Sequence, residues 1–170
     1  MASLLTHQSS RRPRATGFTI IEMMVVVGVL GILAMVALPS MQGLIANQRV
    51  RNVTTDLMVT LMFARSEAIK RNAQINIVPT GGDWSAGWTV QTTGGTTLRG
   101  QDAPSGVTAA GPVGNLVYQG NGRVVGNAAI QFTFRSAAVS TVSMRCLVID
   151  PSGRPNIQMD KDMDTNNGCT

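Results

Sequence analysis

The sequence predicts an α+β fold in which one long N-terminal helix precedes an antiparallel β-sheet domain. Two changes of pattern support this prediction. Residues 18 to about 72 predict a single helix, whose second half carries apolar residues every three or four positions. After Asn72 the period changes to two and turn motifs become frequent, which indicates a succession of short strands. A long helix followed by strands is typical of the α+β class.

The first part of the predicted helix is apolar on every side. Residues 18–38 (FTIIEMMVVVGVLGILAMVAL) form a run of about 32 Å as a helix, enough to cross the hydrocarbon core of a membrane. The only charge in this run is Glu22, and a carboxylate in a bilayer costs a few kcal/mol unless it has a partner, which predicts a functional role. Three arginines precede the run, so the positive-inside rule places residues 1–17 in the cytoplasm.

The second half of the helix is amphipathic, and we expect its apolar stripe to pack on the globular domain. This stripe comprises Val53, Leu57, Leu61, Ala64 and Ala68. Pro39 falls within the helix and should kink or locally loosen it.

The strands are predicted from alternation and from the turns between them. They are Gln74–Val78, Gly87–Gln91, Leu116–Gln119, Arg123–Val125, Ile130–Arg135, Val142–Ile149 and, as a short edge strand, Pro155–Met159. Asn121-Gly122 is a strong hairpin signal. Residues 92–115 are rich in Gly, Thr, Ala and Pro and predict a loop with at most short strands, whereas residues 160–170 predict a polar tail.

Composition excludes several classes of function. The formal charge of +5 includes three arginines before Gly17, and the remaining 11 basic and 9 acidic side chains nearly balance, so a high pI is weak support for nucleic-acid binding. The only histidine is His7, and the sequence contains no catalytic triad or phosphate-binding loop after it. We therefore expect a protein that is not an enzyme and needs no cofactor or metal.

The two cysteines, Cys146 and Cys169, lie in a domain that we expect in the periplasm or outside the cell, an oxidising environment. A disulfide is the favoured interpretation, and such a bridge would contribute on the order of 3 kcal/mol in the chain-entropy model. Two free thiols are the alternative. A zinc site is disfavoured because two cysteines alone do not complete the ligand set.

The join between Gly17 and Phe18 resembles the signal of type IV prepilins and type II secretion pseudopilins. In that family a membrane peptidase cuts after the glycine, and the new N-terminal residue is N-methylated. Gly17 and Phe18 match these two positions, Glu22 matches the glutamate at the fifth mature position, and Pro39 matches the proline near the twenty-second. A secretory signal peptide or a plain signal anchor is the alternative, but neither explains the early glutamate.

The resemblance assigns Glu22 a role in assembly. Cleavage creates an amine on Phe18, and in the family the glutamate of one subunit is thought to pair with the amine of a neighbour. Such pairing removes two costly isolated charges at once and fixes the axial register of the subunits.

Three later segments resemble the GspH/FimT branch of this family, which contains FimT- and FimU-like minor pilins and the pseudopilin GspH. They are LMFARSEAIKRN (Leu61–Asn72), YQGNGRV (Tyr118–Val124) and LVIDPSGRPN (Leu147–Asn156). The resemblance implies a pilin-like fold with three parts: a leader over 1–17, a transmembrane and filament-core helix over 18–46, and a periplasmic or extracellular domain over 47–170.

The implied function is that of a minor type IV pilin that primes assembly or forms the pilus tip, with a type II secretion pseudopilin as the alternative. The implied partners are the prepilin peptidase, other minor and major pilins, the inner-membrane assembly platform and the membrane, which the chain would cross once. Before assembly we expect the chain in the inner membrane with a periplasmic C-terminal domain, and afterwards in the pilus.

A third reading is a DNA-binding pilin of natural transformation. FimT-like pilins carry a late Gly-Arg-x-Arg motif associated with DNA binding, and this chain has Gly153-Arg154-Pro155-Asn156, which lacks the second arginine. Four other cations are candidates to complete a phosphate-binding patch: Arg123, Arg135, Arg145 and Lys161. The acidic tail after Met159 resembles the start of a calcium loop, but it has Thr165 where such a loop needs glycine, so we expect no metal there.

Overall fold

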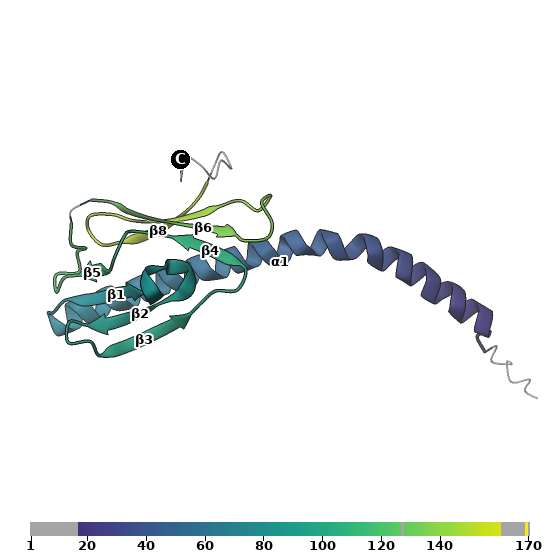
Figure 1. Cartoon of the computed structure of the whole chain (residues 1–170), viewed down its shortest axis with the longest axis horizontal. Coiled ribbons are helices and arrows are strands. Elements are labelled where there is room, and N and C mark those ends of the chain that lie inside the picture. Colours follow the sequence, from purple (N-terminus) through teal and green to yellow (C-terminus); the bar gives the residue numbers. More distant parts are fainter. Residues whose placement is uncertain (1–16, 127, 161–168, 170) are drawn as a thin grey trace, which may run out of the picture. The chain divides into compact units, whose positions relative to one another are not determined.

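One long helix is the first element of the chain, which a computed structural model describes for residues 17–126, 128–160 and 169. Helix α1 (Ile20–Arg71) contains 52 residues, close to the predicted span (Figure 1). The chain divides into two compact units, one ending at Leu38 and the other beginning at Pro39, and α1 contributes to both.

The backbone of α1 is helical through Pro39, and the kink expected there stays a prediction. No helix in the described part of the chain combines the length and the apolar character that a membrane crossing requires.

The C-terminal half of α1 carries a continuous buried stripe. Its residues recur at spacings of three and four, so they lie on one face of the helix. All five residues of the predicted stripe belong to it, and two more extend it toward Pro39: Ala46, Val50, Val53, Leu57, Leu61, Ala64 and Ala68. The polar side chains of Thr54 and Thr60 are also buried, and each donates its hydroxyl hydrogen to the carbonyl four residues earlier. The Thr60 hydroxyl oxygen also accepts a hydrogen bond from the indole N–H of Trp88 at 3.4 Å.

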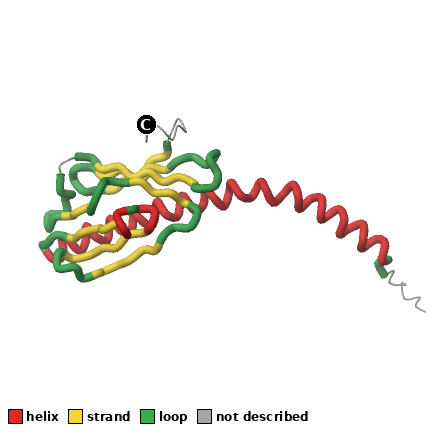
Figure 2. Tube along the Cα trace, in the orientation of Figure 1, coloured by secondary structure: helices red, strands yellow, loops and turns green. Residues whose placement is uncertain are grey.

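Two antiparallel sheets of four strands each follow α1 (Figures 1 and 2). The first has the order β3-β2-β1-β5 and contains β1 (Ile75–Pro79), β2 (Gly87–Thr92), β3 (Thr97–Asp102) and β5 (Leu116–Tyr118). The second has the order β4-β6-β7-β8 and contains β4 (Val107–Ala110), β6 (Ile130–Ser136), β7 (Arg145–Ile149) and β8 (Pro155–Met159). Two short 3-10 helices, Thr80–Gly82 and Trp84–Ala86, join β1 to β2.

Both sheets and the stripe of α1 share one hydrophobic core. Leu57 and Leu61 lie in it together with Ile77 from the first sheet and Phe132 from the second. Trp84 packs edge-on against Phe132 with ring centroids 4.8 Å apart, and its indole N–H donates to the Pro112 carbonyl. The helix stripe is therefore the surface against which both sheets are assembled.

The α+β class is confirmed, and the strand predictions hold except in three places. β3 and β4 lie within residues 92–115, where at most short strands were expected. Arg123–Val125 is not a strand and contributes only the bridge between Tyr118 and Val124. β7 begins at Arg145, three residues later than predicted. The prediction that Pro155–Met159 is an edge strand is confirmed.

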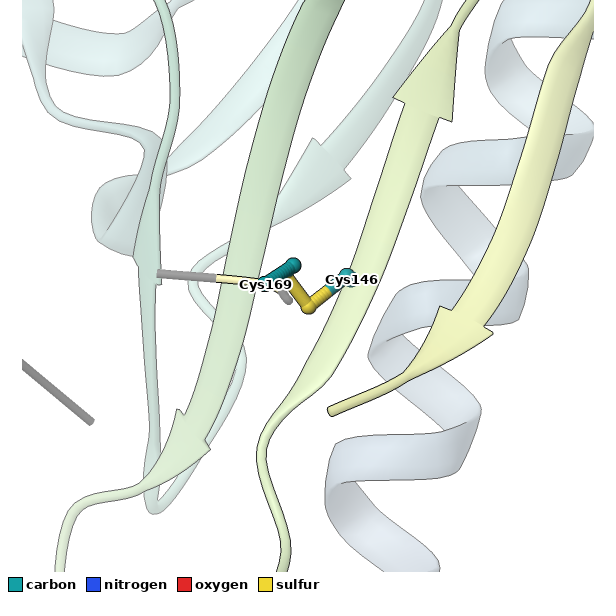
Figure 3. The surroundings of a disulfide bond; sticks show 2 residues. All are labelled: Cys146 and Cys169. Carbon is teal, nitrogen blue, oxygen red and sulfur yellow. A yellow bond between two sulfur atoms is a disulfide. The ribbon is translucent and has the colours of Figure 1, made fainter. Parts of the chain in front are cut away.

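The predicted disulfide between Cys146 and Cys169 is confirmed (Figure 3). Cys146 lies on β7, and the two Cα atoms are 6.0 Å apart, a usual separation for a disulfide. Side chains alternate along a strand, so Cys146 lies on the face of β7 opposite to Leu147 and Ile149, which belong to the core. The bridge thus ties Cys169 to the outer face of the second sheet.

Two leucines of α1 provide a matched test of the shared core. Leu57 is fully buried, whereas Leu44 is 71% exposed on the same helix. We expect Leu57→Ala to lower the free energy of unfolding by about 2–5 kcal/mol and Leu44→Ala to change it by less than about 0.5 kcal/mol. Urea unfolding of the unit that begins at Pro39 measures both, and equal effects would contradict a core centred on this stripe.

Candidate functional site

The first candidate site is the join between Gly17 and Phe18. Gly17, Phe18 and Thr19 precede α1 in a non-helical, exposed segment, and the Phe18 side chain is 78% exposed. A peptidase can bind a peptide bond only where the backbone is not closed into a helix. The predicted cleavage bond lies in such a segment, directly before the first turn of α1.

Thr19 and Glu22 are hydrogen-bonded to each other across the first turn of α1. The Glu22 N–H donates to the Thr19 hydroxyl oxygen at 3.3 Å, and the Thr19 N–H donates to the Glu22 carboxylate at 3.4 Å. This reciprocal pair is a capping box, which satisfies two of the free N–H groups at a helix start. Sequence analysis singled out Glu22 and missed Thr19, although the Thr-x-x-Glu spacing was the signal.

The second candidate site is a corner where two distant turns meet. Gly122 follows Asn121 in the predicted tight turn, and Gly153 lies in the turn between β7 and β8. A side chain on Gly153 would come within 2.2 Å of the Gly122 carbonyl oxygen. Tyr118, which is buried, donates its hydroxyl hydrogen to the Gly153 carbonyl at 3.1 Å. Both glycines have positive φ, +76° and +83°, so glycine meets both the conformational and the spatial requirement.

The turn from Asp150 to Arg154 is held by the Asp150 carboxylate. The Ser152 hydroxyl donates to it at 2.6 Å and the Arg154 N–H at 3.0 Å. The hydrogen bond from the Ser152 side chain is the main reason why the pKa of Asp150 lies below its ordinary value. The carboxylate therefore orders the backbone of the Gly153-Arg154 motif.

Arg65 of α1 joins this corner. Its Nε donates to the Gly122 carbonyl at 3.0 Å, and its charge also acts on the buried phenol of Tyr118. Arg123 and Arg154 follow the two glycines directly and are exposed. We call Arg65, Arg123 and Arg154 the arginine corner. Sequence analysis did not include Arg65, because nothing local in the sequence links it to a turn 57 residues away.

The predicted patch of five cations is divided by the fold. Arg154 and Arg123 lie at one end of the second sheet, whereas Arg145 pairs in register with Phe134 at the other end of β7. The four residue steps from Arg145 to Ile149 span about 13 Å. Arg135 lies on β6 beside Phe134, at the same end as Arg145. Lys161 lies outside the described residues.

None of the three residues of the arginine corner forms an ion pair within the described part of the chain. The ion pairs found there join Glu67 to Lys70 and Arg71. Asp150 acts on Arg154 only at longer range. The corner thus presents three cations whose charge is largely available to an anionic partner.

Two family profiles match the chain. The profile described as "Type II transport protein GspH" matches residues 53–153, and the profile described as "Prokaryotic N-terminal methylation motif" matches residues 12–38. No curated protein is significantly similar in sequence.

Solved structures of two proteins share the fold. The type IV minor pilin FimU of Pseudomonas aeruginosa matches in two crystal forms, at 23% and 24% identity with TM-scores of 0.58 and 0.56. These matches cover 72% and 71% of this chain and 96% and 99% of FimU. The minor pseudopilin EpsH from the type 2 secretion system of Vibrio cholerae matches at 9% identity with a TM-score of 0.53, covering 65% of this chain and 97% of EpsH.

The chain has the architecture of pilin-like proteins. It combines a methylation motif, a long helix and antiparallel sheets packed on that helix. The GspH profile covers more than half of the sequence, and the chain belongs to the GspH family, as its late motifs predicted. The members of this family are structural pilins and pseudopilins.

Two glycines with the same backbone twist test the close approach of the two turns. Gly153 and Gly114 have φ values of +83° and +82°, but a side chain on Gly114 would meet nothing within 4 Å. We expect Gly114→Ala to cost about 1–2 kcal/mol, the price of the backbone conformation alone. Gly153→Ala should cost clearly more, because the turn from Asn121 must also move. Equal losses in urea unfolding would contradict a tight corner.

Tyr118 gives a pH-dependent test of the same corner. Burial raises its pKa above the ordinary value near 10, so the folded state retains the phenolic proton more strongly than the unfolded state. Its contribution to stability is fully present below about pH 10 and is lost as the pH rises further. Tyr118 is the only tyrosine, so tyrosinate absorbance reports it alone.

We expect the folded protein to show little tyrosinate absorbance at about pH 11, where an exposed tyrosine is mostly ionised. Tyr118→Phe should cost about 1 kcal/mol at neutral pH and weaken the alkaline loss of stability. Full ionisation of Tyr118 in the folded protein at that pH would contradict its burial in this corner.

Proposed function

We propose that the chain is a minor subunit of a type IV pilus, processed after Gly17 and incorporated into the filament through its N-terminal helix. The observation that carries this proposal is the presence of both signatures in one chain, the methylation motif over residues 12–38 and the GspH domain over residues 53–153. The exposed, non-helical segment around Phe18 supports cleavage and methylation at this position.

The methylation motif implies a membrane-anchored precursor. We further propose a single crossing by residues 18–38, with residues 1–17 in the cytoplasm and residues 39–170 in the periplasm. The support for this crossing is the apolar sequence of residues 18–38 and the three arginines that precede it. Membership of the family also implies processing by a prepilin peptidase and assembly with other pilins or pseudopilins.

The capping box suggests how Glu22 acts in assembly. In the precursor its carboxylate accepts one long hydrogen bond from the Thr19 N–H and forms no ion pair within the described residues. After cleavage, the amine of Phe18 on a neighbouring subunit is the cation that this carboxylate lacks. Pairing of the two would make docking more favourable than leaving both charges isolated.

Processing is tested by producing the chain in cells with and without a prepilin peptidase. With the peptidase, mass spectrometry should find a chain that begins at Phe18 and carries one extra methyl group. Replacement of Gly17 by a bulky residue should leave the full precursor in the membrane. An uncleaved wild-type chain in the presence of an active peptidase would contradict the proposal.

Two substitutions separate the two roles of Glu22. Glu22→Gln retains the capping box, which accepts glutamine, but removes the charge. Thr19→Val removes the hydroxyl of the cap and leaves the charge. If pairing with the amine drives assembly, Glu22→Gln is cleaved normally and depleted at least about tenfold from sheared filaments, a difference of about 1.4 kcal/mol, whereas Thr19→Val assembles. Equal depletion of both variants would instead assign Glu22 to helix capping.

A pseudopilin of a type II secretion machine is the second candidate, because the FimU and EpsH folds both match this chain. Deletion of the gene distinguishes the two. Loss of surface pili with normal protein secretion supports the pilus, and the reverse result supports the secretion machine.

The arginine corner favours a third role, DNA binding by the assembled subunit. The observation in its favour is the convergence of Arg65, Arg123 and Arg154 without ion-pair partners in the described part of the chain. Duplex DNA should bind the unit that begins at Pro39 more weakly as salt rises, and Arg123→Ala with Arg154→Ala should weaken binding and lower the salt dependence. Arg135→Ala, at the other end of the sheet, is the matched control. Equal losses would contradict a site at the corner.

A further inference from the structure

A second group of cations lies at the opposite end of the domain, where the chain enters it from Pro39. Arg49 and Arg51 lie on α1, Arg135 is the second-last residue of β6 and Arg145 is the first residue of β7. We call these four residues the basic collar. None of them forms an ion pair within the described residues.

Three of the four residues of the basic collar interact with other parts of the domain or with each other. Arg49 borders a shallow hollow with Gln42, Ile45 and the loop that follows β6, and its guanidinium would lie 3.0 Å from a side chain at Gly106. Arg145 projects from the core face of β7, and burial, together with the nearby charge of Arg51, lowers the pKa of Arg145. Figure 1 shows the loops before β4 and after β6 beside this part of α1.

The surroundings of the basic collar contain few negative charges. Residues 39–55 of the helix, residues 103–106 before β4 and residues 136–144 after β6 contain no Asp or Glu. Asp160, whose N–H donates to the Met144 carbonyl near Arg145, is buried and is not presented at the surface. The collar therefore carries an excess positive charge that nothing in the described part of the chain neutralises by direct pairing.

Apolar side chains lie between Pro39 and the collar. Met41, Leu44 and Ile45 are 52%, 71% and 47% exposed. Along a helix they lie about 3–9 Å beyond Pro39, and Arg49 lies about 15 Å beyond it. The headgroup layer of a bilayer is about 5–8 Å thick, so this order of apolar and then basic side chains matches the order of acyl chains and headgroups at a membrane surface.

We propose that the basic collar binds the headgroups of anionic phospholipids and holds the globular unit against the membrane before assembly. This inference rests on the membrane anchoring proposed above. If residues 18–38 cross the bilayer, Met41, Leu44 and Ile45 are the first large apolar side chains beyond it. Arg49 and Arg51 follow within the next two turns of the helix and are the first cations after Pro39, so their charges come closest to the headgroups along the chain. Extraction of the subunit into a filament would then require release of these headgroups.

The test uses the full chain in nanodiscs of phosphatidylcholine, with or without phosphatidylglycerol. A fluorophore is attached through Ala138→Cys, an exposed position on the loop beside Arg49, and a quencher is attached to lipid headgroups. We expect quenching to be about twofold stronger with phosphatidylglycerol, and this difference to disappear at about 0.5 M salt.

The double variant Arg49→Gln with Arg51→Gln should lose the difference, and both residues are exposed, so the fold has no buried partner to lose. The matched control Arg123→Gln with Arg154→Gln removes the same charge from the other end of the domain and should retain the difference. Equal quenching in both lipids, or equal loss in both double variants, overturns the inference.

Extraction with alkaline carbonate distinguishes failure of the inference from failure of the anchoring. If the chain stays in the membrane but its quenching does not depend on phosphatidylglycerol, only the proposed lipid contact is overturned. A chain that is extracted contradicts the proposed anchoring, and the inference falls with it.

Discussion

The fold depends on one stripe of small and branched apolar residues along α1. From Ala46 to Ala68 this face is buried, and residues of both sheets meet on it. Neither sheet alone has a second covering layer, so the helix supplies the surface that each needs to exclude water from its inner face. The alanines at positions 64 and 68 leave no large side chain on the last turns of the stripe, which accommodates the buried aromatic and aliphatic residues of the sheets.

The same helix continues from the methylation motif into this core, so one element belongs to both parts of the protein. Any force on the N-terminal helix acts directly on the element that holds the domain together. The basic collar and the arginine corner lie toward opposite ends of the part of α1 that carries the core. Arg49 and Arg51 lie near its start and Arg65 near its end. The fold thus separates a surface suited to the membrane from a surface suited to an anionic partner beyond it.

Local patterns predicted most of the fold, and long-range contacts account for what they missed. The helix stripe and β1, β2, β6 and β8 follow from spacing and turns that lie within a few residues. β3 escaped prediction because it is a mostly exposed edge strand with Gly100 in its centre, so it lacks a buried face that alternation could reveal. The candidate sites show the same division, since the Gly17–Phe18 join is local, whereas Arg65 meets Gly122 only through the tertiary fold.

The most direct test of the account is the identity of the subunit in surface filaments. Filaments sheared from cells that make the wild-type chain are analysed by mass spectrometry for peptides of the GspH domain and for the N-terminal peptide. The account predicts both, with the N-terminal peptide beginning at methylated Phe18 and at low abundance relative to the major pilin. A chain that is processed and stable in the membrane but absent from pili and from secretion pseudopili would contradict its role as a filament subunit.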